Sequence, residues 1–132
     1  MKLLIFSLVS IFASASFAQG HIVCKNEGFT KLAIDFQVQG QSLKATVLAA
    51  NSDGDEYMPK VGDKAVLNLD KEASKADWAI FRTTDGIDSR GYSLNVKKAD
   101  LAAGGTFRGV VGTSTEYSDL TWASYEMSCT VR

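Results

Sequence analysis

Few side chains in this sequence have a type and spacing that suit catalysis. The only histidine is His21, and no serine stands in the GxSxG context of a nucleophile elbow. Zinc sites need several cysteine or histidine ligands at short spacings, whereas the two cysteines, Cys24 and Cys129, lie far apart in the chain. The glycines also lack the spacing of a phosphate-binding loop. The sequence therefore predicts neither an enzyme active site nor a bound cofactor.

Carboxylates remain as candidate functional groups, and they are dense in the connection 51–63, NSDGDEYMPKVGD. Asn51, Asp53 and Asp55 have the alternating spacing with which a calcium-binding EF-hand loop begins. The first glycine of this connection comes too early, however, and Gly62 stands where the bidentate glutamate belongs, which excludes an EF-hand. A looser calcium site on these three side chains stays open as an alternative to a solvated turn.

Residues 1–18 have the layout of a secretory signal peptide, with Lys2 ahead of an apolar run and small residues at Ser16 and Ala18. We expect cleavage after Ala18, which leaves residues 19–132 as one β-domain in the periplasm or outside the cell. The apolar run is too short to span a bilayer comfortably. Losing Lys2 moves the formal charge from −1 to about −2, which disfavours binding to nucleic acid or to anionic membranes.

Export places both cysteines in a compartment where disulfides persist, and only one pairing is available, Cys24 with Cys129. This bond closes most of the domain into one loop, for which the chain-entropy model gives a stabilisation of about 4 to 5 kcal/mol. We therefore expect a structural disulfide rather than a reactive or metal-binding pair.

The elements that must position these residues are strands, because apolar and polar residues alternate with period two through most of the exported domain. Two of the runs form a hairpin around Gly40. The segments 70–76 and 98–105 are the only helical candidates. The expected strands are 21–24, 31–39, 42–50, 63–71, 77–85, 92–98, 105–113 and 123–132.

Short connections favour sequential antiparallel pairing, and joining the first strand to the last removes two bare sheet edges. We therefore predict an all-β fold, a small antiparallel eight-stranded meander barrel whose N- and C-terminal strands are joined by the disulfide. A two-sheet β-sandwich with the same bond is the alternative. Charged residues on the outward faces, such as Lys31, Asp35 and Lys44, argue against contact with lipid, so no membrane insertion is expected.

A meander gathers alternate connections at one end, which brings together 26–30, 51–63, 85–91 and 113–119. Acids outnumber bases on and beside these segments, whereas the opposite end is balanced. Such an acidic rim suits a basic partner or divalent cations, although surface acids also serve solubility. The acids are Glu27, Asp53, Asp55, Glu56, Asp63, Asp85, Asp88, Glu116 and Asp119, and the bases are Lys25, Lys60 and Arg90.

Aromatic side chains that face outward are a second candidate binding feature, after the acidic rim. In 77–85, either Trp78 and Ile80 or Ala79 and Phe81 must face outward, and Trp122 lies on the face opposite the inward residues of the last strand. If both tryptophans are exposed, they form a contact patch or a platform on which sugars stack. The alternative is that a loop or a second small core covers them.

These features predict an exported, monomeric binding module that recognises a basic protein partner through its acidic end, an enzyme inhibitor being one form of such a protein. A barrel that binds calcium or a small ligand is the alternative, and a carboxylate-dependent hydrolase is the second alternative. The residues expected to contact the partner are Asp53, Asp55, Glu56, Tyr57, Met58, Asp85, Asp88, Glu116 and Tyr117.

Overall fold

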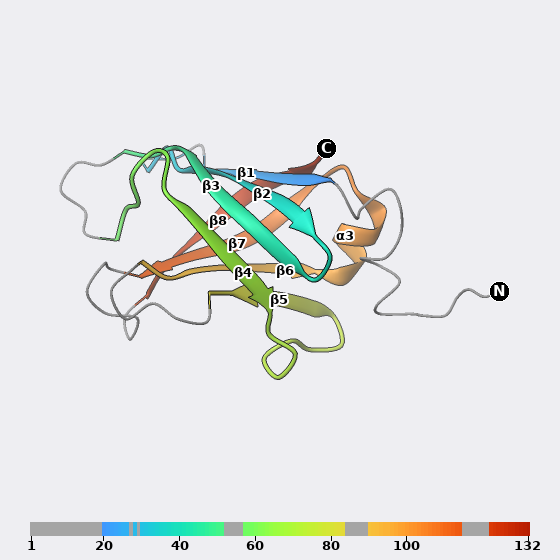
Figure 1. Ribbon diagram of the computed structural model, residues 1–132. Helices are drawn as coiled ribbons and strands as arrows, with labels where there is room; N and C mark the ends of the chain where they lie inside the picture. The colour runs from blue at the N-terminus through green and yellow to red at the C-terminus, as the bar shows by residue number, and fades with distance from the viewer. Residues whose placement is uncertain (1–19, 27, 29, 52–56, 84–89, 115–121) are drawn as a thin grey trace.

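A computed structural model of the chain shows a closed antiparallel barrel in which each strand pairs with its neighbours in sequence and β1 pairs with β8 (Figure 1). The structure describes residues 20–26, 28, 30–51, 57–83, 90–114 and 122–132. This confirms the predicted eight-stranded meander barrel over the β-sandwich. The elements are β1 (His21–Lys25), β2 (Ala33–Gln39), β3 (Ser42–Ala49), β4 (Lys64–Leu69), β5 (Trp78–Arg82), β6 (Tyr92–Lys97), α3 (Lys98–Ala103), β7 (Thr106–Ser114) and β8 (Trp122–Val131).

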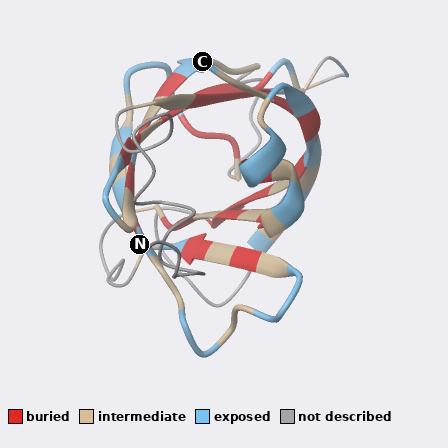
Figure 2. Ribbon diagram, turned by 90° about the vertical axis from the view of Figure 1, so that its right-hand side faces the viewer, coloured by how far each residue is buried: buried red, intermediate tan, exposed pale blue. Residues whose placement is uncertain are grey.

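The period-two alternation explains which side chains fill the barrel, because successive residues of a strand point to opposite faces. Along β2, Ile34 and Phe36 are fully buried, whereas Asp35 between them is only partly buried. Buried and intermediate residues accordingly alternate along β5, the strand in the lower part of Figure 2. The largest fully buried side chains are Phe36, Phe81, Ile22, Leu32, Ile34, Leu43, Leu67, Leu94, Met127, Val47, Val96 and Val111.

The disulfide joins the first and last strands as predicted. Cys24 and Cys129 stand directly opposite each other in the β1–β8 pair, with 4.0 Å between their Cα atoms and no exposed surface on either residue. Gly109 on β7 makes room for this bond, since a Cβ atom at that position would lie 3.0 Å from the Cys129 sulfur. The disulfide is therefore part of the packed interior as well as a covalent seam.

The short helix α3 lies across part of one barrel opening (Figure 2) and buries Leu101 in the same core. Of the two predicted helical segments, only 98–105 contains a helix. In 70–76 the side chain of Asp70 accepts hydrogen bonds from the backbone N–H groups of Glu72 and Ala73, at 3.1 and 3.0 Å. A short aspartate side chain that binds the following N–H groups favours a turn over a helix.

Among the described residues, no helix is long and apolar enough to cross a membrane.

Candidate functional site

The closed meander places the strand ends that flank four connections, β1–β2, β3–β4, β5–β6 and β7–β8, at one end of the barrel (left in Figure 1). We call this end the loop end. The opposite end carries α3 and the other connections. The topology on which the acidic-rim prediction depends is therefore present. Most of the predicted contact residues lie outside the described residues, namely Asp53, Asp55, Glu56, Asp85, Asp88, Glu116 and Tyr117.

The two described members of that set differ from each other. Tyr57 is partly exposed, and its carbonyl oxygen accepts a 2.7 Å hydrogen bond from the Thr113 hydroxyl. Met58 is only 4 % exposed and belongs to the core cluster. Met58 as a partner contact stays a prediction, and its apolar side chain is packed inside the barrel instead of facing solvent. Tyr57 and Met58 thus attach the 51–63 connection to the barrel.

The weak calcium candidates are only partly described. Asn51 is partly buried, and its backbone N–H donates to the Thr30 carbonyl oxygen at 2.8 Å, while Asp53 and Asp55 lie outside the described residues. Within the described part of the chain, no group of three or more His, Cys, Asp or Glu side chains is placed to hold a metal ion. The calcium site therefore stays a prediction, because two of its three residues lie outside the described residues.

A buried polar cluster, which the sequence patterns did not reveal, lies beneath the loop end. Thr113 and Ser114 have no exposed surface although both are polar. The Ser114 hydroxyl accepts a 2.7 Å hydrogen bond from the Gly91 N–H, and its carbonyl oxygen accepts another of 2.7 Å from the Arg90 guanidinium. These bonds satisfy polar groups that would otherwise be costly to bury.

Tyr92 belongs to the same cluster and is only 2 % exposed. Among the described residues, its hydroxyl has no hydrogen-bond partner of good geometry. Burial, and next the negative charge of Asp63, raise the pKa of the Tyr92 hydroxyl well above its usual value, while the positive charge of Arg90 opposes this shift. Tyr92 therefore resists ionisation more strongly than an exposed tyrosine does.

His21 is held on the outside of the barrel, where its Nδ1 atom lies 3.0 and 3.1 Å from the two carboxylate oxygens of Asp35. The backbone of His21 also pairs with Arg132, with hydrogen bonds of 3.1 and 2.8 Å. This arrangement links β1 to β2 and to the C-terminus. The only histidine of the sequence thus has structural contacts with neighbouring segments.

Both tryptophans face outward. On β5, Ala79 and Phe81 are buried inside the barrel, so Trp78 and Ile80 lie on the outer face, where both are partly exposed. Trp122 is 36 % exposed, and its ring lies close to Gly91. A Cβ atom at Gly91 would lie only 2.7 Å from that ring, so the glycine is needed for the ring to lie there. A loop or second core does not hide either ring completely.

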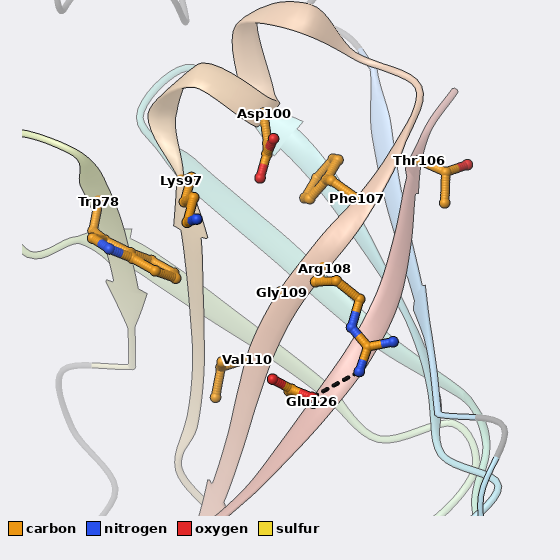
Figure 3. Close-up of a pocket in the computed structure, with 9 residues that line it drawn as sticks. All are labelled: Trp78, Lys97, Asp100, Thr106, Phe107, Arg108, Gly109, Val110 and Glu126. Atoms are coloured by element: carbon orange, nitrogen blue, oxygen red, sulfur yellow. Dashed lines mark hydrogen bonds and ion pairs between the residues drawn. The ribbon is translucent and has the colours of Figure 1, made fainter.

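Each tryptophan borders a hollow on the outer surface. The first, which we call the Trp78 hollow, has a volume of about 490 Å³ and lies near α3, outside β5 to β8 (Figure 3). The second, of about 620 Å³, lies beside Trp122, along β4 and β5, where Asp70 and Arg82 form an ion pair of 3.3 Å. The Trp78 hollow is lined by Trp78, Lys97, Asp100, Thr106, Phe107, Arg108, Gly109, Val110 and Glu126.

No protein-family model, no curated protein and no solved structure matches this chain. Its class is defined by its own geometry as an eight-stranded antiparallel meander barrel, closed by a disulfide between its first and last strands. The disulfide fits an oxidising compartment outside the cytoplasm.

Proposed function

We propose that this protein is an exported binding module that holds a basic protein partner at its loop end, after removal of residues 1–18 and release into the periplasm or the exterior. The observation that carries the proposal is the meander, which directs four connections to one end. Those connections hold most of the acids counted in the sequence, whereas the other end is balanced in charge. A clustered negative surface accelerates encounter with a basic partner and fixes its orientation.

The barrel supports this role because its frame is braced where the connections begin. Thr113 on β7 binds the backbone of Tyr57, and Thr30 binds the backbone of Asn51, so the connection 51–63 is attached at its start and near its middle. A rigid frame lowers the conformational entropy that a binding surface loses in a complex. An inhibitor that covers the active site of a basic enzyme is one form of this function.

The alternatives have less support. A carrier of small ligands needs an internal cavity, but large side chains such as Phe36, Phe81 and Leu94 are packed inside this barrel. Calcium binding and carboxylate-dependent hydrolysis depend on acids of the connections, and nothing among the described residues favours either over binding of a partner.

The test is affinity capture from envelope and secreted fractions of the source organism, with the oxidised domain as bait. The double variant Asp53→Asn/Glu56→Gln removes two acids from the loop end, and Glu72→Gln/Asp77→Asn removes the same two residue types at the opposite end. We expect a partner that the wild type and the control retain and that the loop-end variant loses by about tenfold or more.

Purified partner and bait then give the affinity by calorimetry, together with its dependence on salt. Steep weakening with rising ionic strength is expected of an acidic binding surface. Identical captured proteins with all three baits would remove the loop end as the binding site.

A further inference from the structure

We propose that the Trp78 hollow binds a neutral oligosaccharide. This site is independent of the loop end and adds a second, carbohydrate-binding function to the one proposed above. It rests on three observations: an outward tryptophan at the wall of a defined hollow, a balanced set of charged side chains around it, and the apolar side chains Phe107 and Val110 of β7 in its lining.

The hollow lies on the outer surface beside the barrel end that carries α3, and Asp100 of this helix lines it. Trp78 stands on one side and the pair Arg108 and Glu126 on the other, with Asp100 of α3 at the top and Val110 below (Figure 3). A volume of about 490 Å³ lies within the range of small-molecule sites, roughly 300–1,000 Å³. The hollow is open to solvent at the surface, as a site for part of a longer chain must be.

The charges around the hollow argue for an uncharged ligand. Lys97 and Arg108 contribute two positive charges, and Asp100 and Glu126 contribute two negative charges. Arg108 Nη2 and Glu126 Oε1 lie 2.7 Å apart, so this pair is already neutralised. A strongly charged ligand would be attracted by the side chains of opposite charge and repelled by those of like charge. Hydroxyl groups, in contrast, can donate hydrogen bonds to the carboxylates and accept them from the cations.

Trp78 supplies the contact that hydroxyl groups cannot make. The Lys97 ammonium lies over the indole ring, 5.8 Å from its centre and within the range of a cation–π contact, so a sugar that stacks on this face takes the place of the ammonium. Pyranose rings carry one face of C–H groups with slightly positive hydrogens, which pack favourably on the negative face of an aromatic ring. Apolar stacking combined with polar side chains of both signs is the chemistry that recognises sugars.

The experiment titrates ¹⁵N-labelled oxidised protein with cellotetraose, chitotetraose and maltotetraose, read out by amide and indole N–H shifts. We expect at least one of them to shift the Trp78 indole and the backbone amides of Lys97, Arg108 and Glu126 in a saturable way at millimolar concentrations or below. Absence of saturable shifts with all three sugars would overturn the proposal, as would shifts centred on Trp122 instead.

Three variants separate the site from general effects on folding. Trp78→Ala should weaken sugar binding by about tenfold or more, and Asp100→Ala, on the surface of α3, by about threefold to tenfold. Trp122→Phe should bind as the wild type does and identifies which indole signal belongs to Trp78. Unchanged affinity in both Trp78→Ala and Asp100→Ala would overturn the assignment.

The loop-end variant Asp53→Asn/Glu56→Gln distinguishes this inference from the proposed function. We expect it to keep full affinity for the sugar even if it loses the protein partner. Loss of sugar binding in that variant, with native amide spectra elsewhere, would place the sugar at the loop end and contradict the inference.

Discussion

At the scale of single residues, the burial of Tyr92 predicts that the barrel loses stability at alkaline pH. A tyrosine in an unfolded chain ionises near pH 10, whereas burial and the charge of Asp63 raise the pKa of Tyr92 in the fold. Below about pH 10 both states keep the proton, so the contribution of this group is constant. Above that pH the unfolded chain releases the proton and the folded chain does not, so stability falls as pH rises.

We therefore predict that Tyr92→Phe flattens this alkaline decline. The variant loses a hydroxyl that has no well-formed hydrogen bond among the described residues, so its free energy of unfolding near pH 8 should stay within about 1 kcal/mol of the wild-type value. Urea denaturation at intervals from about pH 8 to pH 11 measures both curves. Parallel curves would show that ionisation of Tyr92 is not the cause.

At the scale of elements, the period of the sequence predicted most of the fold. Alternation placed Leu32, Ile34, Phe36 and Val38 on one face, and all four are buried. The pattern could not predict that Met58 is buried, because the connection that contains it shows no regular alternation of apolar and polar residues. Its burial depends on how the chain returns over the barrel end. Thr113 and Ser114 were missed for a related reason: their polar side chains are buried only because partners distant in sequence satisfy them.

The Trp78 hollow shows the same limit at the level of a site. The sequence showed that either Trp78 and Ile80 or Ala79 and Phe81 must face outward, but it could not decide which pair does so. It also did not bring Asp100, Arg108 and Glu126 beside Trp78, because that neighbourhood is created by the position of α3 and by the β7–β8 register. Fold class follows from local alternation, whereas a surface site requires the strand register.

The helix α3 gives a test of how an element closes the barrel. Leu101 is 2 % exposed and packs in the core, although the helix itself has only six residues. A helix this short has little stability of its own, so its apolar contact must hold it in place. We predict that Leu101→Ala lowers the free energy of unfolding by about 2 to 4 kcal/mol, as other large-to-small core changes do.

The matched control is Ala102→Ser, because Ala102 is exposed on the same helix. This change should stay within about 0.5 kcal/mol of wild type. Both variants are measured by urea denaturation in the oxidised form. An equal effect of the two substitutions would mean that α3 is not held by the contact of Leu101.

At the scale of the whole molecule, the disulfide and the pairing of β1 with β8 both hold the barrel closed. The hydrogen-bonded pairing of β1 with β8 closes the sheet, and the Cys24–Cys129 bond spans 105 residues of sequence at that seam. Cross-linking residues this far apart restricts the unfolded chain strongly. The noncovalent seam and the buried core remain when the bond is removed, so the barrel should lose stability without losing its topology.

We therefore predict that the double variant Cys24→Ala/Cys129→Ala keeps the strand pairing but is less stable by about 2 to 5 kcal/mol. Denaturant unfolding of wild type and variant, each with and without reductant, measures this difference. Reductant should lower the stability of the wild type toward that of the variant and leave the variant unchanged. A variant as stable as the oxidised wild type would show that the packed β1–β8 pair alone closes the barrel. The disulfide would then contribute no stability that an oxidising compartment could preserve.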